Sequence, residues 1–90
     1  MNKVYRLAQG VQVRKEIWGL LFYSQSDHKI HFIRSKDMLY PWHFDGTWTF
    51  DHIIREIAER LEIPFEAVER SIKKVIDRLI EKEMVVNELC

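Results

Sequence analysis

The chain has 90 residues, 47% of them hydrophobic and 31% charged, and its 14 basic side chains balance its 14 acidic ones. This size and composition predict one small globular domain over residues 1–90, with a single core. The zero net charge argues against the basic character that is typical of proteins that bind DNA or RNA.

Other bulk features favour a cytoplasmic protein. The only cysteine is Cys90, so no internal disulfide can form, which suits a reducing compartment. The N-terminal 16 residues carry four positive charges and no long apolar run. They therefore predict neither a signal peptide nor a membrane span, and we expect no membrane partner.

The front half of the chain has the two-residue period of β-strands. Three short strands are expected, at Val11–Val13, Leu20–Tyr23 and Lys29–Ile33, with a polar turn at Ser24–His28 between the last two. The simplest arrangement is an antiparallel meander. Val4–Leu7 is a candidate for a further short strand.

The segment Ser35–Phe44 is ambiguous. Ser35 can cap a helix whose first turn carries Asp37, but Pro41 interrupts its middle. We expect a short or broken helix here, followed by a turn at Asp45-Gly46.

The back half has the period of amphipathic helices. Thr49 is a good cap for a helix over Phe50–Leu61, and Pro64 suits the first position of a longer helix that ends near Glu83. Met84–Val86 is expected to be extended. The apolar stripes consist of Phe50, Ile53, Ile54, Ile57, Ala58 and Leu61 in the first helix, and Val68, Ile72, Val75, Ile76 and Leu79 in the second. The sequence thus predicts an α+β fold that resembles a winged helix-turn-helix, with a three-stranded antiparallel sheet packed on three helices.

Motifs for catalysis are scarce. The four histidines, His28, His31, His43 and His52, do not have the spacing of metal ligands. No phosphate-binding glycine loop, nucleophile motif or paired carboxylates on one helix face are found. We therefore expect a binding protein that is not an enzyme and uses no metal or cofactor.

Nucleic acid is the alternative ligand, because a sheet with a helix-turn-helix resembles a winged helix. A recognition helix brings its N-terminal turns to the DNA groove. Here those turns carry Glu66 and Glu69, which only Arg70 offsets. The local charge disfavours DNA and favours a peptide ligand.

A row of basic residues flanks the apolar stripe of the last helix. At 100° per residue, Ala67, Ser71, Lys74, Arg78 and Lys82 fall along this flank, and the last three of them are basic. One interpretation is an ordinary solvated face. The other is one wall of a groove for an acidic or polar peptide.

The aromatic content leaves a similar choice. Most aromatic side chains are expected in the core. Trp18, beside Gly19, either covers the sheet or lines a pocket.

The order of motifs resembles a known family. The back half, DGTWTFDHIIREIAERLEIPFEAVERSIKKVIDRLIEKEMV, is similar to the helical half of the PqqD-like precursor-peptide recognition elements. The front half is closer to MftB, the peptide chaperone of mycofactocin biosynthesis. Its motifs are YRL (5–7), VRKEIWGLLFY (13–23) and IHFIRS (30–35). The resemblance covers nearly the whole chain.

The resemblance implies a fold and a function. Domains of this family pack three antiparallel strands on three helices and bind the leader of a ribosomally synthesised precursor peptide as an added strand. They present the peptide to a radical SAM maturation enzyme. Carried over by position, the peptide-binding candidates are Lys29, Ile30, His31, Phe32, Ile33 and Arg34 on the third strand and Ser71, Lys74, Val75 and Arg78 on the last helix.

Three positions depart from the family pattern. Ile63 stands where the family often has Asp, Lys15 where MftB-like chains often have Pro, and Pro41-Trp42 interrupts a helix that is continuous in relatives. Periodicity also leaves open which flank of the last helix lines the groove, and Ile76 and Ile80 form the rival set. A third hypothesis is an interaction domain whose exposed strand edge pairs with a second copy.

Overall fold

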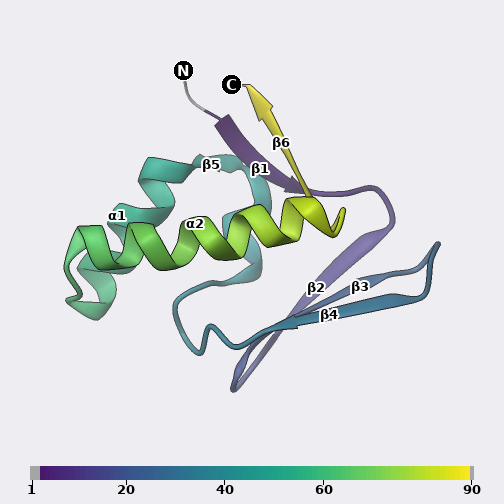
Figure 1. Cartoon of the computed structure of the whole chain (residues 1–90), viewed down its shortest axis with the longest axis horizontal. Helices are drawn as coiled ribbons and strands as arrows, with labels where there is room; N and C mark the ends of the chain where they lie inside the picture. Colours follow the sequence, from purple (N-terminus) through teal and green to yellow (C-terminus); the bar gives the residue numbers. More distant parts are fainter. Residues whose placement is uncertain (1–2, 90) are drawn as a thin grey trace.

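The computed structural model describes residues 3–89 and has an α+β fold (Figure 1). Its elements form two antiparallel sheets of three strands, with the orders β2-β3-β4 and β5-β1-β6, together with two α-helices. In chain order the elements are β1 (Lys3–Leu7), β2 (Val11–Glu16), β3 (Gly19–Ser24), β4 (Lys29–Ile33), the 3₁₀ turn η1 (Pro41–Phe44), β5 (Asp45–Thr49), α1 (Phe50–Leu61), α2 (Phe65–Glu81) and β6 (Val85–Leu89).

The predicted meander is confirmed as the sheet β2-β3-β4. Its third strand has the predicted bounds, while β2 and β3 each extend beyond the predicted strand. In β4, Ile30 and Phe32 are 57% and 61% exposed, whereas His31 and Ile33 are partly buried. This alternation follows from the two-residue period of a strand.

The second sheet was largely missed from the sequence. The prediction of a turn at Asp45-Gly46 was wrong, because these residues begin β5. The candidate strand at residues 4–7 is confirmed as β1, which lies at the centre of this sheet. β6 extends the predicted C-terminal segment and pairs with β1 in a register that places Val4 opposite Glu88.

The two long helices agree with the sequence prediction. α1 has the predicted bounds, and the Thr49 hydroxyl accepts a hydrogen bond from the backbone N–H of His52 at 3.2 Å. This bond satisfies one of the otherwise unpaired amides of the first turn. Pro64 is the residue before α2 rather than its first helical position, and α2 ends at Glu81, two residues before the predicted end.

The first of the three predicted helices does not form as an α-helix, and the expected short or broken helix is reduced to a single 3₁₀ turn. Between Ser35 and Phe44 only the 3₁₀ turn over Pro41–Phe44 forms. Pro41 lacks the amide that a continuing α-helix needs. The buried ring of His43 also accepts the N–H of Tyr40 at 3.0 Å, which fixes a non-helical path. The expected three-helix, winged-helix arrangement is therefore not confirmed.

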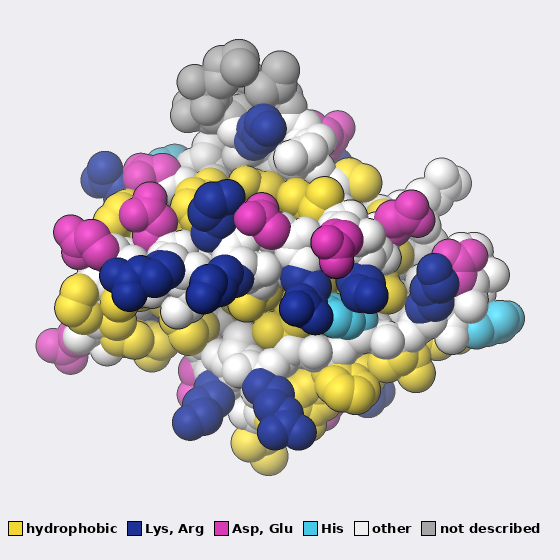
Figure 2. Space-filling model, viewed as in Figure 1, with side chains coloured by type: hydrophobic (Ala, Val, Ile, Leu, Met, Phe, Trp, Pro, Cys, Tyr) yellow, Lys and Arg dark blue, Asp and Glu magenta, His cyan; other side chains and the backbone are white. Residues whose placement is uncertain are grey.

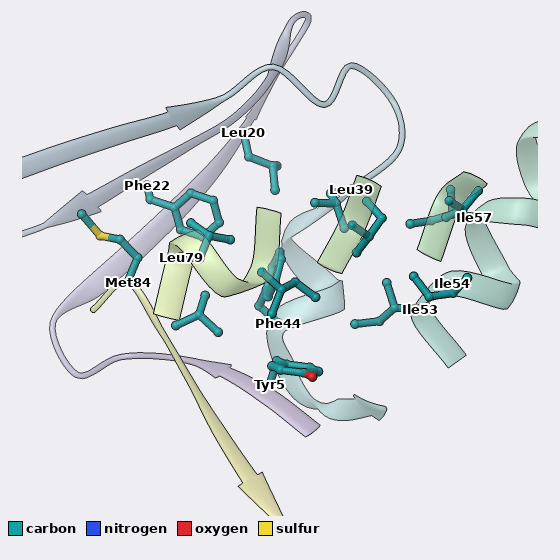
Figure 3. Packing of buried hydrophobic residues seen from close by; sticks show 14 of the residues in the cluster. Tyr5, Leu20, Phe22, Leu39, Phe44, Ile53, Ile54, Ile57, Leu79 and Met84 are labelled. Atoms are coloured by element: carbon teal, nitrogen blue, oxygen red, sulfur yellow. The ribbon is translucent and has the colours of Figure 1, made fainter. Parts of the chain in front are cut away.

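One hydrophobic cluster joins both sheets and both helices (Figure 3). Phe22 of β3 meets Phe44 edge to face, with ring centroids 5.7 Å apart. The predicted inner residues of α2 are buried, apart from Val75, which is only partly buried. The cluster leaves the outer edge of β4 and the Val75 flank of α2 at the surface, and these two features define the candidate site.

Candidate functional site

Strand β4 is an edge strand. It pairs with β3 on one side and with no other strand of residues 3–89 (Figure 1). An edge strand presents a row of unpaired backbone N–H and C=O groups, to which another extended chain can bond.

The sheet register identifies which backbone groups face this edge. The N–H of Gln25, just beyond β3, donates to the C=O of Gly10 on the β2 side at 3.0 Å. Bonding direction alternates along an antiparallel strand. The even-numbered residues of β3 therefore bond toward β4, in the pairs Leu20–Ile33, Phe22–His31 and Ser24–Lys29. It follows that Ile30 and Phe32 direct their N–H and C=O groups to the free edge.

A hollow of about 250 Å³ separates this edge from α2. We call it the β4–α2 groove, and its lining residues are His31, Phe32 and Ile33 from β4 with Lys74, Val75 and Arg78 from α2. A second hollow, of about 530 Å³, continues along the start of β4. It is lined by Lys29, Ile30 and His31 on the strand and, at the end of α2 and just after it, by Glu81, Lys82, Glu83 and Met84. The two hollows share His31, so they form a path along the length of the strand.

The helix wall of the β4–α2 groove is positively charged, whereas its continuation also contains Glu81 and Glu83 beside Lys82. Lys74, Arg78 and Lys82 make no side-chain hydrogen bond or ion pair with any residue of 3–89. On the other side of the helix, Lys73 is neutralised by Asp77 at 3.1 Å. Figure 2 shows a row of Lys and Arg side chains over α2, with a band of hydrophobic side chains below it. The unpaired cations favour an anionic ligand.

His31 responds to these charges. Its partial burial lowers the pKa of the imidazole, and the nearby Arg78 and Lys82 lower it further. The ring therefore stays neutral at neutral pH and adds no charge to the β4–α2 groove, whose cations are Lys74 and Arg78.

The structure brings most of the predicted site residues together, although not all at one place. Six of the ten line the β4–α2 groove, and Lys29 and Ile30 line its continuation. Ser71 is exposed but does not line the groove, and Arg34 lines a different hollow near Trp18.

The fold shows which of the two flanks of α2 lines the β4–α2 groove. Val75 lines the groove, whereas Ile76 is buried and contributes to a crevice beside Tyr5. The rival set of Ile76 and Ile80 therefore does not line the groove.

Several residues that line the hollows were not predicted from the sequence as site residues. Lys82 was recognised as part of the basic row but not as a site residue, and Ile17 and Lys36 were not singled out. Ile17 had a signal, because Ile17-Trp18 is the two-residue connection between β2 and β3. Such hairpin turns usually carry Asn, Asp or Gly, so two large apolar residues there point to a role at the surface.

The described part of the chain contains no group of three or more His, Cys, Asp or Glu side chains placed to hold a metal ion. Within residues 3–89, no helix has both the length and the apolar character that a membrane span requires. Comparison of the chain with protein-family models, curated proteins and solved structures finds no match.

Proposed function

We propose that this chain is a binding module without catalytic activity that recognises an extended peptide by adding it as a strand to β4. The observation that carries the proposal is the free edge of β4, which lies beside the unpaired cations of α2 across the β4–α2 groove. Backbone bonds to Ile30 and Phe32 supply affinity, and the groove selects the side chains of the guest.

The guest is the leader of a ribosomally synthesised precursor peptide, which the module presents to a radical SAM maturation enzyme. This part of the proposal rests on the resemblance to PqqD-like recognition elements and to MftB. The resemblance covers the strand and the helix that border the groove.

The charge of the groove favours an acidic guest over a second copy of the chain. Two β4 strands paired antiparallel about a two-fold axis would place both α2 helices on the same side of the joined sheet. The unpaired Lys74 and Arg78 of each copy would then approach those of the other, which is unfavourable. Carboxylates of a guest peptide would instead form charge-assisted hydrogen bonds with these side chains.

Nucleic acid is the alternative ligand, and the salt dependence of binding distinguishes it from a peptide. The exposed Glu66 and Glu69 lie in the first turns of α2, where a recognition helix would approach phosphates. Duplex binding weakens steeply as salt rises, whereas a strand held by backbone bonds is less affected. Steep salt dependence with duplex DNA, and no peptide binding, would favour nucleic acid.

Amide hydrogen exchange tests strand addition residue by residue. The protein is mixed with the leader segment of a candidate precursor peptide, and exchange is followed by NMR. We expect the amides of Ile30 and Phe32 to become protected at saturation. The amides of Lys29, His31 and Ile33 serve as internal controls, since the register already pairs them with β3. Unchanged exchange at Ile30 and Phe32 in a saturated complex would reject strand addition.

A further inference from the structure

A further hollow, separate from the two beside α2, lies at the tip of the β2–β3 hairpin on the outer side of the sheet. Its walls are Ile17, Trp18 and Phe32, with Arg34, Lys36 and Asp37 at the rim, and its volume is about 680 Å³. We call it the tip hollow. Ile17, Trp18 and Phe32 are 94%, 40% and 61% exposed. Large apolar side chains exposed together around a concave surface mark a binding site.

Contacts within the protein hold the Trp18 and Phe32 side of the tip hollow in place. Trp18 packs edge-on against Phe32, with ring centroids 5.8 Å apart, and its C=O accepts the N–H of Lys36 at 3.0 Å. Gly19 lets the hairpin approach β4 closely, since a Cβ at this position would lie 1.9 Å from the C=O oxygen of Ile33. A preformed site loses little conformational entropy on binding.

The rim of the tip hollow carries cations that are free to bind. Neither Arg34 nor Lys36 makes a side-chain hydrogen bond or ion pair within residues 3–89. Asp37, by contrast, lies 3.4 Å from Nζ of Lys15. An apolar wall beside two available cations suits a large apolar side chain next to a carboxylate.

The tip hollow is continuous with the proposed peptide site. Phe32 lines both the tip hollow and the β4–α2 groove, and Arg34 follows directly on β4. One extended chain lying along β4 therefore reaches both places. At roughly 3.3 Å per residue, a guest that runs from Lys29 to Arg34 needs about six residues.

We propose that the tip hollow is a second specificity pocket for the same guest peptide, and this inference rests on the proposed function. It takes a large apolar side chain and a neighbouring carboxylate of the guest. Successive side chains of a strand point to opposite faces. The apolar anchor faces outward like Phe32, whereas the acid that meets Lys74 and Arg78 faces inward. The two guest residues are therefore separated by an odd number of positions.

Peptide selection tests this spacing without knowledge of the natural guest. A display library of random 12-residue peptides is selected on the immobilised protein, and the enriched peptides are sequenced. We expect a Leu, Ile, Phe or Trp one or three positions from an Asp or Glu. The affinity of an enriched peptide is then measured by fluorescence anisotropy for the wild type and for variants.

The variants have a matched control in the same chain. Trp18→Ala and Ile17→Ser should each weaken binding by about tenfold, because each removes apolar contact with the anchor. Trp42→Ala should leave affinity unchanged, since Trp42 is equally exposed, at 40%, but does not line the tip hollow. Ile17 is 94% exposed, so Ile17→Ser preserves the fold and keeps the test valid if Trp18→Ala unfolds.

A double-mutant cycle separates this inference from the proposed function. Replacing the peptide anchor by Ala should weaken binding to the wild type but have little further effect on Trp18→Ala or Ile17→Ser. If peptides protect the amides of Ile30 and Phe32 but show no such coupling, the tip hollow is not a peptide pocket and the proposed function stands. If bound peptides leave both amides unprotected, strand addition and the shared guest are both rejected. Self-association of the protein that Ile17→Ser abolishes would instead show that a second copy covers the hollow.

Discussion

Nε2 of His43 lies 2.9 Å from Oε1 of Glu56, and this contact ties the segment before β5 to helix α1. Nδ1 of the same ring accepts the N–H of Tyr40, so the ring proton is on Nε2 and is donated to the carboxylate. Arg60 pairs with Glu56 and donates to the backbone C=O of Met38 at 2.8 Å. These bonds stabilise the irregular segment that replaces the predicted first helix.

Removal of the imidazole should destabilise the fold. His43 is fully buried, so His43→Ala leaves a cavity and an unpaired Tyr40 amide, and the Glu56 carboxylate keeps only Arg60 as its donor. We expect a loss of about 3 kcal/mol in the free energy of unfolding, measured by urea denaturation. His52→Ala is the control, because His52 is exposed on α1 and should cost no more than about 0.5 kcal/mol. Equal losses in the two variants would contradict the anchoring role of His43.

The same histidine should make stability depend on pH. Burial lowers the pKa of His43 in the folded protein, although the Glu56 hydrogen bond partly opposes this shift. The unfolded chain therefore binds more protons than the folded protein just below about pH 6.5, the ordinary histidine pKa. The contribution of His43 to the free energy of unfolding should be constant above that pH and fall as the pH is lowered through the window beneath it.

Urea denaturation at several pH values measures this dependence. His43→Gln should reduce the slope below about pH 6.5 without abolishing it, because His31 also has a lowered pKa. A slope that is unchanged in His43→Gln would assign the dependence to other groups.

Gly19 should tolerate no side chain. Its φ is +152°, and a Cβ there would lie 1.9 Å from the Ile33 C=O oxygen and 2.6 Å from the Ser35 amide nitrogen. Because both neighbours are backbone atoms, Gly19→Ala must displace β4, at a cost of roughly 3 kcal/mol or more by thermal or urea unfolding. Gly10→Ala is the matched control. It also has a positive φ, but its nearest atom lies at 3.9 Å, so it should cost only about 1 kcal/mol.

Charge reversal on α2 should weaken an acidic guest. Arg78→Glu and Lys74→Glu each replace an unpaired groove cation with an anion, and we expect about tenfold lower affinity by fluorescence anisotropy. Lys73→Glu makes the same change in net charge on the opposite flank, where the lysine pairs with Asp77, and should have a smaller effect. If all three variants bind equally well, the basic row is an ordinary solvated surface.

Much of the local structure could be predicted from the sequence. The apolar stripe that follows Thr49 predicted α1, and the alternating residues of Lys29–Ile33 predicted β4 and its two faces. These features follow from interactions between residues close in the chain, which leave a periodic pattern. The basic row was likewise visible as Lys74, Arg78 and Lys82 at helical spacing.

What the pattern could not supply was the pairing of distant segments. The sheet β5-β1-β6 depends on contacts such as Val4 with Glu88, and β5 begins with Asp45-Gly46, which by local preference is a turn. The path of residues 35–44 likewise depends on the bond from His43 to Glu56 in the following helix.

Periodicity was enough to predict the strand at Lys29–Ile33 and a basic flank on the last helix. That β4 lies at the edge of its sheet and faces this flank depends on how distant segments pack. Helical periodicity is the same for either side of α2, and the packing of Ile76 into the core is what turns Val75 and Arg78 toward β4. Packing against distant residues also placed Trp18 against Phe32 and so formed the tip hollow at the end of the same strand.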